Sequence, residues 1–102
     1  MFKSENCKNF EGLKIISREK HIDSRGEFFK IFNHDDMKQL GWNDSIKQIN
    51  FSQTFAKGTV RGMHMQFSTY AEFKLVTCIK GAIFDVVIDL RKESKTYLKF
   101  FS

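Results

Sequence analysis

The feature that most constrains the fold of this chain is the shortness of its apolar runs, each of which ends in a polar or glycine-containing cluster. Runs of this kind, rich in Ile, Val, Phe and Thr, are typical of β-strands. Many short strands at this spacing predict an all-β fold, an antiparallel sandwich or barrel. The expected strands cover residues 13–17, 26–32, 46–55, 59–67, 72–80, 81–90 and 96–101.

One stretch has the signals of a short helix instead. Asn33 can accept a hydrogen bond as the N-cap residue, and the acidic Asp35 and Asp36 favour the positive end of a helix. Gly41 can supply the left-handed residue that follows a helix. We therefore expect a single helix near residues 34–40.

The length and charge of the chain limit its class. A chain of 102 residues predicts one domain. Its net charge of +5 suits an anionic partner. The basic residues are scattered without a run of five and without a nucleic-acid-binding motif, so we interpret them as a lysine-rich surface and expect no nucleic-acid partner.

Cysteine usage and hydropathy indicate the compartment. Cys7 and Cys78 form no C-x-x-C pair, so neither a zinc knuckle nor a redox motif is predicted. Two reduced cysteines fit the cytosol. The first ten residues contain no apolar signal-peptide core, and no stretch approaches 18 apolar residues. We expect a cytoplasmic protein without a membrane span.

Polar residues recur inside one expected strand. In residues 46–55, Gln48, Asn50 and Ser52 share one face, and Ile49 lies on the other. In most sheets the polar face contacts water, whereas in a barrel with a ligand cavity it lines that cavity. The alternation alone leaves both interpretations open.

The run KGTVRGMHMQ, residues 57–66, raises the same question. With Glu72 and Gly81, the spacing outlines the first cupin motif, in which H-x-H and a glutamate bind a metal. Here His64 is followed by Gln66, whose amide oxygen is a poor ligand for a transition metal. One histidine and one glutamate are too few ligands, so we expect a cupin-like strand pair without a metal.

Three blocks, in matching order, carry a more specific resemblance. DSRGEFFK, QINFSQTFAKGTVRGMHMQ and YAEFKLVTCIKGAIFDVVIDLRKES resemble the dTDP-4-dehydrorhamnose 3,5-epimerases, metal-free cupin enzymes of deoxysugar biosynthesis. The resemblance begins near residue 13 and covers a little over the first half of a typical member. It implies a cupin-like jelly roll (a double-stranded β-helix) in truncated form, with residues 1–102 as one domain.

The resemblance also implies catalytic roles. His64 matches the general base that removes a proton beside the 4-keto group of a dTDP-4-keto-6-deoxy sugar. Histidine as a residue type has a reference pKa of about 6.5, which suits a base at neutral pH. Lys74 matches the substrate-contacting lysine that faces the enolate oxygen, where a fixed positive charge lowers the barrier. The expected activity is isomerisation without a cofactor.

Other residues match substrate-binding positions of the family. The planar fork of Arg61 suits a diphosphate. For Asp85 and Asp89, a hydrogen-bonding role and a catalytic role both remain open. Strict alternation places Arg61 and His64 on opposite faces, unless a bulge at Gly62 turns both inward. The remaining expected substrate contacts are Arg25, Gln48 and Asn50.

The chain also departs from the family pattern. Lys30 stands where the family has a glutamate, and the family's general-acid tyrosine, the aspartate partner of the base and a second histidine block lie beyond residue 102. Two alternatives therefore remain. One is a non-catalytic nucleotide-sugar-binding or degenerate cupin, and the other is a sugar 3,4-ketoisomerase, although those enzymes usually have H-x-H. Exposed strand edges and the resemblance predict a homodimer.

Overall fold

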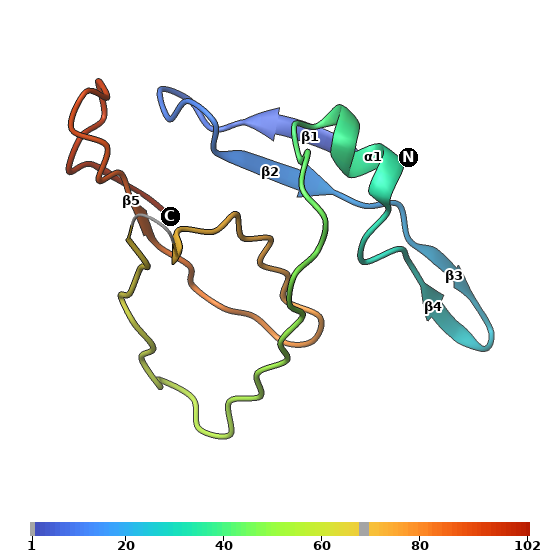
Figure 1. Cartoon of the computed structure of the whole chain (residues 1–102). Helices are drawn as coiled ribbons and strands as arrows, with labels where there is room; N and C mark the ends of the chain where they lie inside the picture. Colours follow the sequence, from blue (N-terminus) through green and yellow to red (C-terminus); the bar gives the residue numbers. More distant parts are fainter. Residues whose placement is uncertain (1, 68–69) are drawn as a thin grey trace. The chain divides into compact units, whose positions relative to one another are not determined.

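A computed structural model of the chain describes residues 2–67 and 70–102. The chain divides into two units, residues 1–43 with 78–102 and residues 44–77. All strands and the helix that the structure describes lie in the first unit (Figure 1). They form three two-stranded antiparallel sheets and one short helix, which confirms the predicted all-β class.

Two of the sheets are hairpins near the N-terminus. β1 (Lys3–Asn6) pairs with β2 (Lys14–Ser17), and β3 (His21–Asp23) pairs with β4 (Gly26–Phe28). β2 confirms the strand expected at 13–17, and β4 is shorter than expected. β1 and β3 were not predicted because their sequences, KSEN and HID, are mostly polar and carry little strand signal.

The third sheet pairs two very short strands. β5 (Val87–Ile88) lies opposite β6 (Phe100–Phe101), and a polar loop joins them. Both strands are shorter than the runs that predicted them, 81–90 and 96–101. Pairing is limited to two residue pairs, Val87 with Phe101 and Ile88 with Phe100.

The predicted helix is present as α1 (His34–Gln39), and its ends have the expected geometry. The Asp36 backbone N–H donates to Asn33 Oδ1 at 3.0 Å. Gly41 has a φ of +100°, and the backbone N–H groups of Gly41 and Trp42 donate to the carbonyls of Lys38 and Met37. These two bonds form a Schellman motif, so both ends of the helix are capped.

The strands expected at 46–55, 59–67 and 72–80 are wrong for this structure. Residues 44–67 and 70–80 form no β-strand. A strand requires a hydrogen-bonding neighbour. The described residues supply no such ladder to these three runs, whereas the hairpins that do form have their partners close in sequence.

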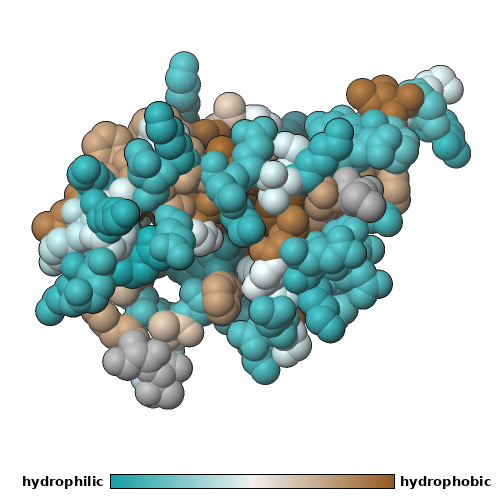
Figure 2. Space-filling model, turned by 90° about the horizontal axis from the view of Figure 1, so that it is seen from above, coloured by the Kyte–Doolittle hydropathy of each residue, from teal (hydrophilic) through white to brown (hydrophobic). Residues whose placement is uncertain are grey.

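The buried core is small and lies in the first unit. Its buried apolar side chains are those of Phe2, Cys7 and Met37. The Phe10 and Phe101 rings pack edge to face at 5.8 Å between centroids. Figure 2 shows apolar residues, in brown, at the surface of the face drawn. Among the described residues, no helix is long and apolar enough to cross a bilayer.

One polar contact joins distant parts of the first unit. Arg91 Nη1 donates to the carbonyl oxygen of Glu11 at 2.8 Å, across 80 positions of sequence. Together with the Phe10–Phe101 pair, it connects the N-terminal stretch of this unit to its C-terminal stretch.

Candidate functional site

Arg61 is held against the stretch that precedes it. The chain turns at Ala56–Thr59, where Gly58 has a φ of +84° and Thr59 Oγ1 donates to the Ala56 carbonyl at 2.8 Å. Beyond the turn, Arg61 Nε donates to Thr54 Oγ1 at 3.1 Å, and Nη2 donates to the Gln53 carbonyl at 3.4 Å. A guanidinium has five N–H donors, so donors remain for a ligand.

The backbone between Arg61 and His64 departs from a regular strand at Gly62. Its φ of +87° lies in the left-handed region, which interrupts the side-chain alternation. A Cβ at this position would lie 3.3 Å from His64 Nδ1, so a side chain here would crowd the imidazole. Because no ladder forms here, this is not a bulge, and the inward orientation of both residues stays a prediction.

Gln48 and Asn50 lie on the same side of their extended segment. Gln48 Nε2 donates to Asn50 Oδ1 at 3.1 Å, and both residues are exposed. This contact agrees with the shared face expected from their i, i+2 spacing.

Lys74 is paired with a neighbouring carboxylate. Its Nζ lies 3.3 Å from Glu72 Oε1, and both side chains are about half exposed. The amide nitrogen of Gln66, oriented toward its acceptors, donates to the same Oε1 at 3.3 Å and to the Tyr70 carbonyl at 3.1 Å. The acidic residue of the predicted cupin motif thus contacts two donors from this unit.

Arg25 lies in the first unit, whereas the other five candidates lie in residues 44–77. It occupies the β3–β4 turn, where its Nη2 donates to Asp23 Oδ2 at 2.7 Å and its backbone N–H donates to Oδ1 at 2.8 Å. The hydrogen bonds from Arg25 hold the pKa of the Asp23 carboxyl below its usual value. The D-x-R pair therefore fixes the turn, and the Arg25 side chain remains largely exposed.

Asp89 is the centre of a hydrogen-bonded cluster that the sequence did not reveal. We define the Asp89 cluster as Asp89, Arg91, Ser94 and Thr96. Arg91 Nε donates to Asp89 Oδ1 at 2.9 Å, and the hydroxyls of Ser94 and Thr96 donate to Oδ2 at 2.5 and 2.6 Å. The closely spaced Asp, Ser and Thr of DLRKESKT were a signal for such a loop.

Two members of the Asp89 cluster are buried, Asp89 at 8% and Thr96 at 3% exposure, whereas the Arg91 side chain is 55% exposed. The hydrogen bonds from Arg91, Ser94 and Thr96 hold the pKa of the Asp89 carboxyl well below its usual range. Of the two roles left open for Asp89, the geometry supports the structural one, because its oxygens are occupied by donors from its own loop.

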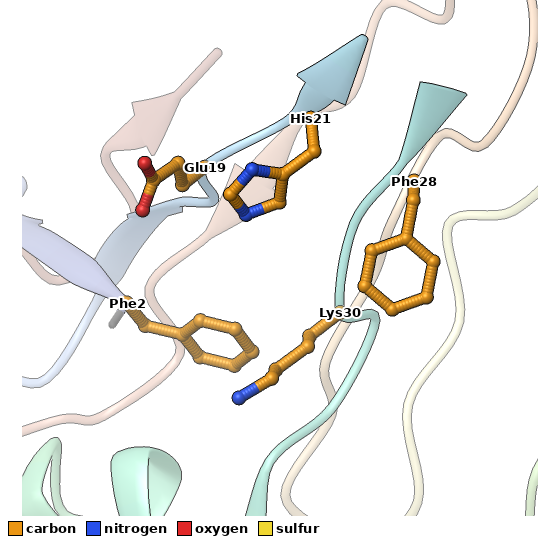
Figure 3. A pocket seen from close by; sticks show the side chains of 5 residues that line it. All are labelled: Phe2, Glu19, His21, Phe28 and Lys30. Carbon is orange, nitrogen blue, oxygen red and sulfur yellow. The ribbon is translucent and has the colours of Figure 1, made fainter. Parts of the chain in front are cut away.

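Lys30 lines a small pocket of about 90 Å³ in the first unit. The other lining residues are Phe2, Glu19, His21 and Phe28. Figure 3 shows the Lys30 side chain extending toward the Phe2 ring, with the His21 imidazole close by. Lys30 therefore adds a positive charge to a partly aromatic pocket.

In the described ranges 2–67 and 70–102, no three His, Cys, Asp or Glu side chains converge as a metal-binding group would. The candidate residues are instead amides, cations and one histidine. Such a set offers donors to an anionic ligand.

Comparison with known proteins identifies the family. Residues 8–102 match the family described as dTDP-4-dehydrorhamnose 3,5-epimerase. The chain belongs to this family. The matched range contains Arg61, His64 and Lys74, to which the resemblance gave site roles.

Curated relatives agree with this assignment. The chain is 39% identical over 90 residues to the dTDP-4-dehydrorhamnose 3,5-epimerase of Sinorhizobium fredii, covering 88% of this chain and 46% of that protein. It is 40% identical over 91 residues to the protein of that name from Escherichia coli K12, covering 88% and 49%. The chain spans about half the length of these relatives. No solved structure matches it.

Proposed function

We propose that this chain acts in the 3,5-epimerisation of a dTDP-4-keto-6-deoxy sugar, as part of dTDP-rhamnose biosynthesis. The observation that carries the proposal is the family match over residues 8–102, which includes every candidate site residue. The relatives from Sinorhizobium fredii and Escherichia coli are named for this reaction. A single domain over residues 1–102, as part of a cupin jelly roll, belongs to the same proposal.

In the proposed reaction, His64 acts as the general base. The C–H bond beside the 4-keto group breaks, its proton passes to the imidazole, and its electron pair moves toward the carbonyl oxygen to form an enolate. Lys74 stabilises the negative charge on that oxygen. A proton donor on the opposite face, either a second protein group or water, then delivers a proton to the same carbon. The enolate electron pair forms the new C–H bond, the carbonyl is restored, and the carbon is inverted.

Substrate binding is assigned to the cationic and amide residues. Arg61 still has N–H donors beyond its contacts with Thr54 and Gln53, and a guanidinium fork fits a diphosphate. The paired amides of Gln48 and Asn50 offer further polar contacts. Arg25 is proposed as an additional contact, and the net charge of +5 favours the anionic substrate.

A second candidate function is nucleotide-sugar binding without turnover. The observation that favours it is that Gln48, Asn50 and Arg61 offer polar groups to a ligand whether or not His64 acts as a base. A 3,4-ketoisomerase is less favoured, because Gln66 replaces the histidine and contacts Glu72.

We further propose a metal-free, cytoplasmic homodimer. Phe84 and Ile88 are exposed apolar residues around the short strand β5, and open strand edges recruit other strands. Light scattering of the purified chain tests this assembly, since a monodisperse monomer contradicts it.

The deciding experiment combines binding and isotope exchange. Calorimetry measures dTDP binding to the folded chain, and NMR measures deuterium at carbons 3 and 5 of dTDP-4-keto-6-deoxyglucose in deuterated water. The proposed function predicts binding and deuterium incorporation at these carbons. Binding without exchange supports the second candidate. Absence of binding at millimolar dTDP, in a folded sample, contradicts both.

A further inference from the structure

Glu72 links two polar residues on either side of it in sequence. Its Oε1 lies 3.3 Å from Lys74 Nζ. With the Gln66 amide turned so that its nitrogen faces acceptors rather than donors, that nitrogen donates to the same oxygen at 3.3 Å. Gln66 is itself anchored, because it also donates to the Tyr70 carbonyl at 3.1 Å. All four residues belong to the same unit of the chain.

The chemistry of this contact differs from that of a metal ligand. A cupin glutamate that binds a metal keeps its carboxylate available to the ion. Here one carboxylate oxygen of Glu72 accepts from the Gln66 amide and forms an ion pair with the Lys74 ammonium group. That oxygen is therefore occupied by protein donors and is not left open for a metal ion.

We propose that Glu72, supported by Gln66, is a positioning residue that fixes the Lys74 ammonium for its action on the enolate oxygen. This inference rests on the proposed function, which assigns that action to Lys74. Glu72 itself contacts no reacting atom in the proposal. Its role is to restrict where Nζ can lie.

The physical reason is the freedom of the lysine side chain. Lysine carries its charge on a flexible four-carbon stem and loses rotamer entropy when that charge must occupy one place. A carboxylate that holds Nζ before the substrate arrives removes part of this cost from the reaction. Since both side chains are about half exposed, at 45% and 47%, water weakens the pair and the effect is moderate.

Four variants isolate the role. Glu72→Ala removes the acceptor, and Glu72→Gln removes the charge but keeps an amide oxygen. Lys74→Ala, alone and combined with Glu72→Ala, tests whether Glu72 acts only through Lys74. Glu93→Ala removes an exposed glutamate of the other unit as the matched control.

Two readouts follow each variant. The first is the NMR signals of the Lys74 Cε and Nζ in labelled protein, which report the pairing without any substrate. The second is the rate of deuterium incorporation into dTDP-4-keto-6-deoxyglucose in deuterated water. We expect Glu72→Ala to shift the Lys74 signals and slow exchange by about fivefold, the upper range for a partly exposed ion pair. Glu72→Gln should retain most of the rate, and Glu93→Ala should change neither readout.

The outcomes separate this inference from the proposed function. If the Lys74 signals do not move in Glu72→Ala, or exchange becomes faster, the positioning role is overturned while the proposed function stands. If Glu72→Ala slows exchange equally in the Lys74→Ala background, Glu72 acts independently of Lys74 and the inference is wrong. If the signals move but the unmodified chain shows no exchange, the proposed function fails, and the catalytic role of the pair fails with it.

Discussion

The Asp89 cluster differs from a second set of polar residues in where its hydrogen bonds go. We call this second set, Gln48, Asn50, Arg61 and His64, the exposed cluster because all four are exposed. In the Asp89 cluster, the carboxylate accepts from three side chains of its own loop and is buried. In residues 44–77, Gln48, Asn50, Arg61 and His64 are all exposed, and none of the described residues of this unit is buried. One cluster satisfies its own polar groups, and the other leaves donors and acceptors facing solvent.

This difference distinguishes polar residues that stabilise the fold from polar residues that are available to bind a ligand. A buried polar group must have its partners within the protein, because an unpaired one is costly. An exposed group is already solvated and can exchange water for a ligand at little cost in stability. Substitutions in the Asp89 cluster should therefore reduce stability, and substitutions in residues 44–77 should reduce binding or catalysis.

The largest expected effect is on catalysis at His64. His64→Asn removes the proposed base and should lower deuterium exchange into the substrate by about 10²–10⁴-fold, the usual contribution of a general base. Because the His64 side chain is exposed, the urea unfolding midpoint of the variant should hardly differ from that of the unmodified chain. A variant that loses stability and exchange together would break the distinction between the two clusters.

The next effect is on ligand affinity at Arg61. Arg61→Ala should weaken dTDP binding by about 1.5–3 kcal/mol, typical of charged hydrogen bonds, as measured by calorimetry. Lys57→Ala, an exposed cation in the adjacent turn, is the control and should have a small effect. Equal losses in both variants would mean that net charge, rather than the Arg61 fork, attracts the ligand.

Stability should respond to Asp89 in a pH-dependent way. The pKa of Asp89 is lowered in the folded chain, so its stabilisation is present above the ordinary aspartate pKa near 4 and is lost as the pH falls below that value. Asp89→Asn should therefore destabilise the chain at pH 7 and flatten the stability loss below pH 4 in urea titrations. An unchanged acid profile would contradict the assignment.

The smallest effect compares two threonine hydroxyls. Thr96→Val removes a buried donor to Asp89 and should cost about 1 kcal/mol of unfolding free energy. Thr59→Val removes an exposed donor to the Ala56 carbonyl, which water can replace, and should cost less. Equal costs, measured by urea unfolding, would show that burial does not distinguish the clusters.

Local structure was the part of the fold most accessible from sequence. The helix was predicted because its signals, Asn33 at one end and Gly41 at the other, act within a few residues. The strand β2 was predicted from its own apolar run, whereas its hairpin partner β1 was not. The runs 46–55, 59–67 and 72–80 were not paired, because a ladder depends on a partner that strand propensity does not identify.

The sequence predicted which residues belong to the candidate site better than it predicted the contacts that their side chains make. The i, i+2 rule placed Gln48 and Asn50 together, and their side chains are hydrogen-bonded. The Glu72–Lys74 pair shows the same spacing but was not predicted, because Glu72 was considered only as a metal ligand. The Asp89 cluster depends on a turn that brings Ser94 and Thr96 back toward one carboxylate, and alternation along a strand gives no information on such turns.

The contact between Arg91 and Glu11 has a consequence for the order of folding. It joins positions 80 residues apart, so a long loop must close before this bond and the Phe10–Phe101 packing can form. The hairpins β1–β2 and β3–β4 need only short closures and should form earlier. Because closure entropy grows slowly with length, doubling such a loop costs only about 0.6 kcal/mol. Insertions between Asp44 and Thr77 should therefore slow the late step of folding more than they weaken the final structure.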